Sequence, residues 1–171
     1  MAERNYKLSQ ASVYQLGISL VNSLELIHNS GLVYNDLKPD NILIGHKDQL
    51  PKSDSLKNIF EDASMHLVDF GLATKWTDCE TGIHIKQSKT KYFAGNIYFS
   101  SNNQLEGKTS SRRDDLHSLI YMLIYLLNSA SIPLVDEALN KSKDNNVANS
   151  IITVYKTKKE KSLVGMCTGR A

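Results

Sequence analysis

The chain has 171 residues, of which 41% are hydrophobic and 22% charged, and its formal net charge at pH 7 is +2. This composition excludes an intrinsically disordered protein, because such chains combine few apolar residues with a large net charge. The small net charge argues against a nucleic acid or a membrane surface as the partner. The longest apolar run, residues 119–127, is shorter than the roughly 20 residues of a membrane span.

Length, cysteine content and the first residues narrow the class of protein further. A chain of this length suits one domain with a core of its own. Cys79 and Cys167 lie far apart without metal-ligand spacing, so we expect free thiols. Because the first residues lack the apolar core of a signal peptide, we expect a soluble protein in the cytoplasm or the nucleus.

The first predicted element is a long amphipathic helix over residues 9–30. Apolar residues recur there at helical intervals, Ser9 is a suitable N-cap and Gly31 is a suitable stop. The recurring residues are Val13, Leu16, Leu20, Leu24 and Ile27.

Three short apolar runs follow this helix, at residues 32–34, 42–44 and 65–68. Short apolar runs bounded by polar loops predict buried strands around a turn. The segment at residues 46–64 is polar and contains Pro51, which predicts a surface insertion.

A second long helix is predicted over residues 114–128. Its apolar residues lie on nearly every side, which predicts a helix buried all round at the centre of the domain. Beyond it the pattern weakens: residues 134–139 predict one or two helical turns, and residues 151–161 a further helix.

Two groups of lysines have both an anion-binding and a solvated interpretation. They are Lys86, Lys89 and Lys91, and then Lys156, Lys158, Lys159 and Lys161. Lysines in loops and on helix surfaces are usually solvated, and we favour that interpretation for both groups.

The residues with the clearest chemistry are Asp36, Lys38 and Asn41 on one polar loop, and Asp69 after an apolar run. Phosphoryl transfer needs a carboxylate near the attacking hydroxyl, a cation near the phosphate, and oxygen ligands for Mg²⁺. These four residues supply those parts in order along the chain. An ordinary polar surface loop is the alternative, and the order of the four roles disfavours it.

The loop at residues 34–41 resembles the catalytic loop of eukaryotic protein kinases, and the Asp-Phe-Gly at residues 69–71 resembles their metal-binding segment. Residues 95–119, with Ser-Arg-Arg-Asp-Asp at 111–115, resemble casein kinase 1, as does Thr-Gly-Ile-His-Ile at 81–85. The resemblance implies an α+β, mostly helical fold: a protein-kinase-like C-terminal lobe lacking the N-terminal small lobe. The activation segment would then span residues 69–103.

The resemblance also implies roles for individual residues. Asp36 would be the catalytic base, and Lys38 would face the γ-phosphate of ATP. Asn41 and Asp69 would hold Mg²⁺ and thereby the nucleotide. Asp115 would brace the catalytic loop through its backbone amides, which is a structural role.

Three positions depart from the family pattern. Asn35 replaces an arginine that pairs with a phosphate on the activation segment in many kinases, so we expect no activation by phosphorylation there. Asn96 replaces the usual threonine, and Tyr98 replaces an arginine that grips acidic or phosphorylated substrates. The change at Tyr98 leaves open whether the family's preference for acidic substrates applies here.

The residues before Asp36 contain no Gly-x-Gly-x-x-Gly and no strand-borne lysine. We therefore expect a partial serine/threonine protein kinase domain over residues 1–171, inactive alone, with ATP and Mg²⁺ as cofactors and a protein as substrate. Two alternatives stay open: a pseudokinase-like protein-binding module, and an enzyme completed by a small-lobe partner in trans. We expect neither a nucleic acid nor a membrane as partner.

Overall fold

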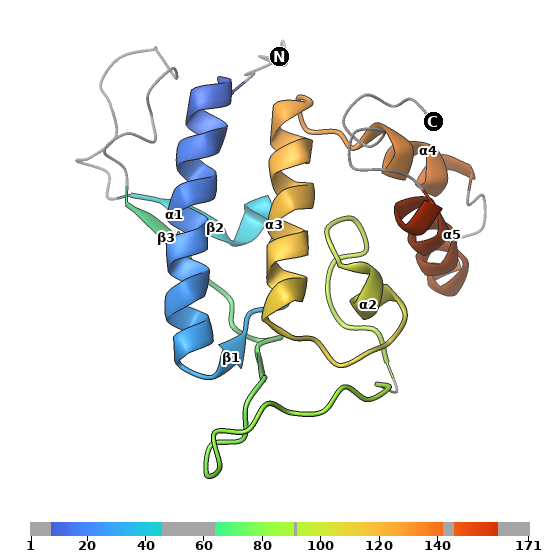
Figure 1. Ribbon diagram of the computed structural model, residues 1–171. Helices are drawn as coiled ribbons and strands as arrows, with labels where there is room; N and C mark the ends of the chain where they lie inside the picture. The colour runs from blue at the N-terminus through green and yellow to red at the C-terminus, as the bar shows by residue number, and fades with distance from the viewer. Residues whose placement is uncertain (1–7, 46–63, 91, 142–145, 161–171) are drawn as a thin grey trace.

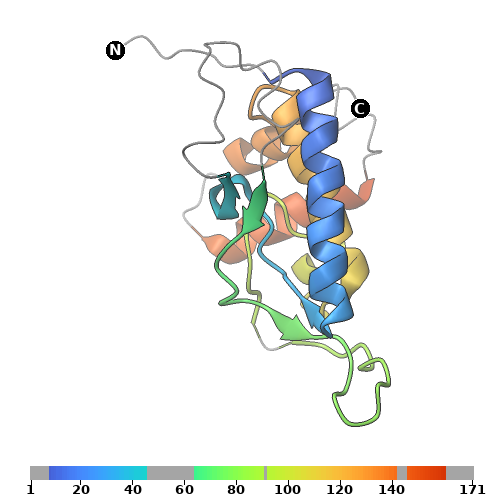
Figure 2. The ribbon, with the colours of Figure 1, turned by 90° about the vertical axis from the view of Figure 1, so that its left-hand side faces the viewer.

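The computed structural model describes residues 8–45, 64–90, 92–141 and 146–160. The chain runs through α1 (Gln10–Asn29), β1 (Leu32–Val33), the 3₁₀ turn η1 (Pro39–Asn41), β2 (Ile42–Ile44), β3 (Met65–Leu67), β4 (Thr74–Lys75), α2 (Asn102–Leu105), α3 (Arg112–Leu127), α4 (Pro133–Lys141) and α5 (Val147–Glu160). Helices form the body of the molecule, and the short strands lie along one side of it (Figures 1 and 2). The expected mostly helical α+β fold is confirmed.

Helix α1 begins and ends where the sequence predicts. The side chain of Ser9 accepts a hydrogen bond from the amide of Ser12, which caps the first turn. Gly31 follows the helix with a φ of 84°, a left-handed conformation that favours glycine. The buried face carries Val13, Leu16, Leu20 and Leu24.

Helices α1 and α3 pack side by side in opposite directions. A Cβ on Gly17 would lie 3.1 Å from a methyl carbon of Leu123, so the small residue allows close approach near one end. Near the other end, Nε2 of His28 lies 2.8 Å from Oδ2 of Asp115. This pair forms the scaffold from which the loop after α1 extends.

The prediction that the second long helix is buried all round was wrong. Helix α3 begins at Arg112, and Leu116 and Ile120 on one side are 42% and 40% exposed. On α1, Tyr14, Ile18 and Val21 are also exposed. An apolar face of this helix pair therefore remains uncovered by the residues that the structure describes.

The strands form two small antiparallel sheets. Strand β1 pairs with β4, and β2 pairs with β3 in a register that places Ile42 opposite Leu67. The prediction of buried strands was wrong for β2, where Leu43 is 54% exposed, because only one face of the ribbon, with Ile42 and Leu67, packs against the core. Strand β4 was not predicted, since its Thr-Lys sequence has no apolar run.

The C-terminal helices complete the core. Ile132, Val135 and Val154 are fully buried with Leu20, Leu24 and Met122. The predicted one or two turns at residues 134–139 are helix α4, and the further helix is α5. None of the described helices is long and apolar enough to cross a membrane. Lys91, Lys161, Cys167 and all but the last residue of the predicted insertion lie outside the described residues, whereas Cys79 is an exposed free thiol.

Candidate functional site

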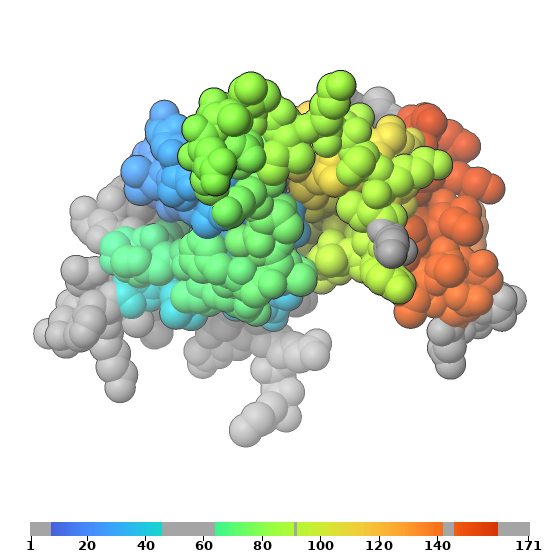
Figure 3. Space-filling view, turned by 90° about the horizontal axis from the view of Figure 1, so that it is seen from below, coloured from blue at the N-terminus to red at the C-terminus, as the bar shows by residue number. Residues whose placement is uncertain are grey.

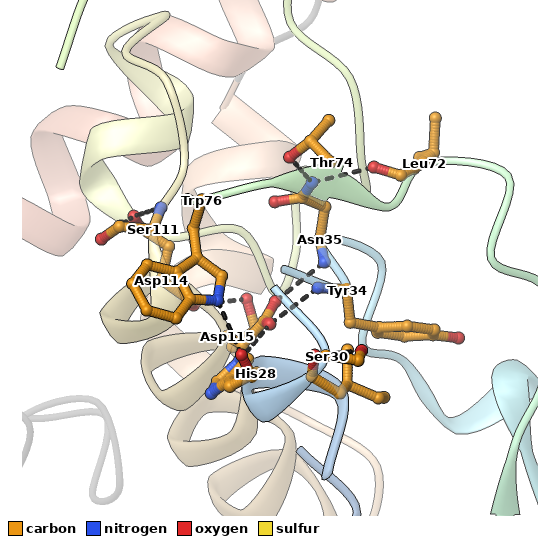
Figure 4. A network of polar contacts seen from close by, with 12 residues as sticks. His28, Ser30, Tyr34, Asn35, Leu72, Thr74, Trp76, Ser111, Asp114 and Asp115 are labelled. Atoms are coloured by element: carbon orange, nitrogen blue, oxygen red, sulfur yellow. Dashed lines mark hydrogen bonds and ion pairs between the residues drawn. The ribbon is translucent and has the colours of Figure 1, made fainter. Parts of the chain in front are cut away.

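The loop after β1 is held from beneath by one buried carboxylate. Asp115, in the first turn of α3, is fully buried, and its two oxygens accept hydrogen bonds from the amides of Tyr34 and Asn35, both at 2.8 Å. His28 contacts the same carboxylate from α1 (Figure 4). The expected bracing of this loop by Asp115 is confirmed.

Asp36, Lys38 and Asn41 form a cluster on this loop. Oδ2 of the buried Asp36 lies 2.6 Å from Nζ of Lys38 and 3.0 Å from Nδ2 of Asn41. A second bond from Nδ2 of Asn41 reaches the carbonyl of Asp36. All these contacts to the carboxylate use Oδ2, so Oδ1 is the atom that can face an incoming hydroxyl.

The ion pair fixes the charge state of the lysine. The hydrogen bond from Lys38 to Asp36 raises the pKa of the lysine, and the charges of Asp40 and Asp69 add to this effect. Lys38 is therefore a cation at neutral pH. It is also only partly covered, which leaves it accessible to an anionic group.

Asp69 reaches the cluster through the pairing of β2 with β3. The amide of Val68 donates to the carbonyl of Asn41 at 3.1 Å, so Asp69 lies one residue beyond a backbone contact with Asn41. Oδ1 of Asp69 accepts a bond from the amide of Gly71 at 3.1 Å. The side chain is exposed, so its carboxylate faces solvent beside the loop.

Two residues of this site have a left-handed backbone. The φ angles are 70° at Asn35 and 61° at Asp69. Asparagine and aspartate adopt this conformation more readily than other residues that carry a side chain. Asn35 lies near the start of the loop that carries the cluster, and Asp69 follows β3.

Asn35 joins the loop to the start of the segment after Asp69. Its Nδ2 donates to the carbonyl of Leu72 and to Oγ1 of Thr74, both at 2.8 Å (Figure 4). The residue is uncharged and its amide hydrogens are both engaged. These two bonds tie the loop at residues 34–41 to residues 72–74.

Tyr34 packs between the loop and the Asp-Phe-Gly segment. Its hydroxyl donates to the carbonyl of Val68, and its ring meets that of Phe70 edge-on, with centroids 5.3 Å apart. Burial raises the pKa of Tyr34 to about 12, and nearby carboxylates contribute to the rise. The hydroxyl is therefore neutral at physiological pH and acts as a donor.

Residues 97–101 lie near the end of the segment that follows Asp69. A second buried carboxylate holds this end. Oδ1 of the fully buried Asp114 accepts bonds from Oγ of Ser101 at 2.7 Å and Nδ2 of Asn103 at 3.0 Å. Oδ2 accepts a bond from the amide of Ser111 at 2.8 Å. Asp114 therefore joins α2 to the start of α3, and the sequence analysis missed this role.

Tyr98 is engaged inside the protein. Its hydroxyl donates to Asp136 at 2.6 Å and accepts a bond from the amide of Ile132, also at 2.6 Å. Burial and then the bond to Asp136 raise its pKa. The hydroxyl thus links residues 97–101 to α4. The side chain at position 98 is itself uncharged.

The interpretation of the second lysine group as solvated was wrong for Lys158. The side chain is buried, and Nζ donates to the carbonyls of Tyr98 and Ser100 at 2.8 Å and of Ile97 at 3.4 Å. Nζ also lies 4.0 Å from the ring centroid of Tyr121. Spacing alone did not distinguish this lysine, because its acceptors lie about 60 residues away in the chain. Lys156 and Lys159 are exposed, as expected.

The donor set suits a hard divalent cation bound together with phosphates. Asn41 directly precedes β2 and Asp69 follows β3, the strand paired with it, and Mg²⁺ combines amide and carboxylate ligands with water and phosphate oxygens. Among the described residues there is no cluster of three or more His, Cys, Asp and Glu that would hold a metal without such help. Lys86 and Lys89 are exposed, in keeping with the solvated interpretation of their group.

Comparison with known proteins agrees with this geometry. Residues 1–165 match the protein kinase domain family. The chain is similar to the casein kinase 1-like protein HD16 of Oryza sativa subsp. japonica, with 36% identity over 121 residues that make up 70% of this chain and 16% of that protein. It is also similar to casein kinase I homolog 1 of Saccharomyces cerevisiae, with 35% identity over 121 residues, 71% of this chain and 21% of that protein.

The chain thus spans about a fifth or less of the length of these two relatives. Its helices and small antiparallel sheets correspond to the helical, C-terminal lobe of a kinase, and the Asp36 loop and the Asp69 segment lie together at one edge of that lobe. On these grounds the chain belongs to the protein kinase family and is casein kinase 1-like.

Proposed function

We propose that this chain is part of a kinase of casein kinase 1 type, which, once completed by a small lobe, transfers the γ-phosphoryl group of ATP to serine and threonine hydroxyls of proteins. The observation that carries the proposal is the cluster on one braced loop, in which Lys38 and Asn41 hold Oδ2 of Asp36. Catalysis of phosphoryl transfer depends mainly on position and charge, and this cluster supplies both.

Each residue then has one role. Oδ1 of Asp36 orients the substrate hydroxyl and accepts its proton. Lys38 neutralises charge on the transferring group. Asn41 and Asp69 would hold Mg²⁺, which neutralises the phosphates of bound ATP.

We also propose that residues 1–171 bind ATP weakly by themselves. The residues before Asp36 contain no glycine-rich loop and no strand lysine. Nucleotide pockets bury most of their ligand, whereas Asp69 and Phe70 are exposed here. A kinase small lobe, on the same polypeptide or on a partner, would supply the second wall.

The metal site can be tested on the chain directly. Mn²⁺ with ATP, used as a paramagnetic probe, should broaden the amide NMR signals of Ile42, Val68 and Phe70. Asp69→Asn should abolish this broadening, whereas Glu25→Ala, a change at an exposed carboxylate on α1, should leave it intact. Broadening that is independent of Asp69 would contradict the proposed metal ligands.

The chemistry is tested by fusing a casein kinase 1 small lobe to residue 1. The chain alone should transfer negligible phosphate to casein, and the fusion should transfer it to serine and threonine. Asp36→Asn should reduce that rate by about 10²–10⁴-fold, because the base is lost. A folded, ATP-binding fusion whose rate does not depend on Asp36 would overturn the proposal, and a folded fusion without any transfer would favour a protein-binding module.

A further inference from the structure

Helix α5 reaches the backbone beside the candidate site through one buried polar side chain. The buried side chains of α5 are those of Val154 and Lys158. Nζ of Lys158 donates to the carbonyls of three residues in the range 97–100. In Figure 3 the orange-red atoms of α4 and α5 lie against the yellow-green atoms that follow residue 92, away from the blue atoms of α1. Because buried acceptors are costly to leave without a donor, the position of this backbone depends on a helix that contributes no residue to the site itself.

A tight turn links the backbone held by Lys158 to the loop after β1. The amide and Oγ of the buried Ser100 both donate to the carbonyl of Asn96, at 2.9 and 2.6 Å. Gly95 precedes this turn with a φ of 126°. A Cβ on Gly95 would lie 3.2 Å from Oγ of Ser100 and 3.3 Å from the carbonyl oxygen of Asn35. Gly95 is therefore packed between the turn and the peptide group of Asn35.

Gln104 makes a second link between the same two parts of the chain. Its Oε1 accepts a bond from the amide of Ser101 at 2.8 Å, directly after the last carbonyl that Lys158 binds. Its Nε2 lies 3.5 Å from both the carbonyl oxygen and Oδ1 of Asn35. The side chain of Gln104 is buried, so its surroundings hold it in this place. Two routes of contact therefore run from the backbone that α5 holds to Asn35.

The backbone of Asn35 needs support from more than one side. Its φ of 70° is left-handed, and a residue with a side chain keeps such a conformation only where its surroundings fix it. Asp115 binds the amide of Asn35 at 2.8 Å. The carbonyl of the same residue lies against Gly95 and Gln104. Loss of support on the carbonyl side would let the peptide group between Asn35 and Asp36 rotate.

We propose that Lys158 is a positioning residue for Asp36. From α5 it holds the backbone of residues 97–100, and Gly95 and Gln104 transmit this constraint to the peptide group that precedes Asp36. The link from this geometry to catalysis rests on the proposed function, whereas the structural coupling rests on the contacts alone. A displacement of about 1 Å at a reacting group can cost about 10²-fold in rate even when the substitution is remote.

Amide hydrogen exchange of the ¹⁵N-labelled chain measures this coupling without ATP or turnover. The readout is the protection factor of the Asn35 amide divided by that of the Leu24 amide, which lies in the core of α1 and reports general loss of stability. Lys158→Met removes the ammonium and keeps a long side chain, so this ratio should fall about tenfold. Lys156→Met, at an exposed position on the same helix, should leave the ratio unchanged.

Two further variants separate positioning from stability. Val154→Ala weakens the packing of α5 without removing a bond to a carbonyl, so it should lower both protection factors and keep their ratio. Ser100→Ala removes only the hydroxyl that bonds to the carbonyl of Asn96, so the fold should be kept while the ratio falls about threefold. An unchanged ratio in folded Lys158→Met would refute the proposal. If Lys158→Met does not fold, an unchanged ratio in Ser100→Ala would refute it, and an equal fall with Val154→Ala would assign the effect to general loosening of α5.

The small-lobe fusion described above supplies the catalytic readout. Lys158→Met should reduce its kcat about tenfold while KM for ATP stays within about twofold, because Asn41 and Asp69 lie outside the contacts that the change disturbs. If the protection ratio falls in the chain but the unchanged fusion transfers no phosphate, the proposed function fails alone. If the unchanged fusion is active and Lys158→Met has the same kcat, the role of Lys158 in positioning Asp36 fails alone.

Discussion

Two buried charges of opposite sign organise the backbone on the two sides of the site. Asp115 accepts hydrogen bonds from the amides of Tyr34 and Asn35, whereas Lys158 donates to the carbonyls of Ile97, Tyr98 and Ser100. Asp115 fixes the start of the loop at residues 34–41, and Lys158 fixes the backbone at residues 97–100. Each buried group makes its hydrogen bonds mainly to the backbone, and the loss of such buried bonds is costly.

The region between these two anchored parts is different. Residues 78–90 are exposed throughout: Asp78 makes a local turn with Thr81, and Ser88 and Thr90 are bonded to Thr109 and Gly107. The fold thus anchors the backbone at residues 34–35 and 97–100 on buried side chains and leaves residues 78–87 at the surface. The predictions below test how much each anchor contributes.

The largest effect is expected from Asp115→Ala. The change leaves two buried amides without acceptors and removes the partner of His28, so it should lower the free energy of unfolding by about 3–5 kcal/mol. Urea denaturation followed by circular dichroism measures this loss. Glu25→Ala, at an exposed carboxylate, should change stability by less than about 0.5 kcal/mol. A loss below about 1 kcal/mol for Asp115→Ala would show that the loop holds its shape without the brace.

Lys158→Met should cost less, about 1–3 kcal/mol at pH 7, because three carbonyls lose their donor while the desolvation of a charge is relieved. The sharper test is pH. Burial lowers the pKa of Lys158 from 10.5 to about 7, so between these values the unfolded chain binds more protons than the folded one.

Stability should therefore rise as pH increases from 7 toward 10, by at most about tenfold in the folding equilibrium constant per pH unit. Lys158→Met should flatten this rise. Burial raises the pKa of Tyr34 and of Tyr121 to about 12, so these tyrosines oppose the rise only above pH 10. Thermal unfolding at several pH values below 10 measures the difference. An equal slope in both proteins would assign the pH dependence to other groups.

The contrast between the anchors also explains what the sequence could predict. Asp115 was predictable because the motif at residues 111–115 resembles a known family and places an acid in the first turn of a helix. The helix over residues 9–30 followed from periodicity and capping, which are local properties. Asp36, Lys38 and Asn41 were identified for the same reason, since all three lie within one short loop.

Features that depend on distant contacts were missed. Lys158 is buried because three carbonyls from another part of the chain surround it, and its own helix has exposed lysines on either side. The exposure of Leu116 and Ile120 depends on which elements cover α3, and helical periodicity does not report that. The left-handed backbone conformations of Asn35 and Asp69 likewise cannot be predicted from the pattern of hydrophobic residues.

A smaller effect is expected from Ser101→Ala, at the end of the segment that Lys158 anchors. Oγ of Ser101 accepts a bond from the amide of Gln104 at 3.2 Å and donates to Asp114 at 2.7 Å. Loss of this cap should lower the free energy of unfolding by about 1–2 kcal/mol. Ser110→Ala, at a hydroxyl outside the cap, serves as the matched control. Equal losses in the two variants would show that the capping contacts contribute nothing specific.

The smallest effect is expected where a cation is exposed instead of buried. The guanidinium of Arg112 stacks over the ring of Trp76 at 3.8 Å, and Nε1 of Trp76 donates to the carbonyl of His28 at 2.8 Å. Arg112→Met should cost about 0.5–1 kcal/mol, because cation–π contacts of exposed residues are weak.

Trp76 is the single tryptophan of the chain, so its fluorescence reports this contact directly. Without the guanidinium over its ring, quenching by acrylamide should increase, whereas Arg113→Met at the neighbouring exposed position should leave it unchanged. A loss of stability as large as that of Lys158→Met would remove the distinction between buried and exposed cations. Unchanged quenching would show that the guanidinium does not shield the ring in solution.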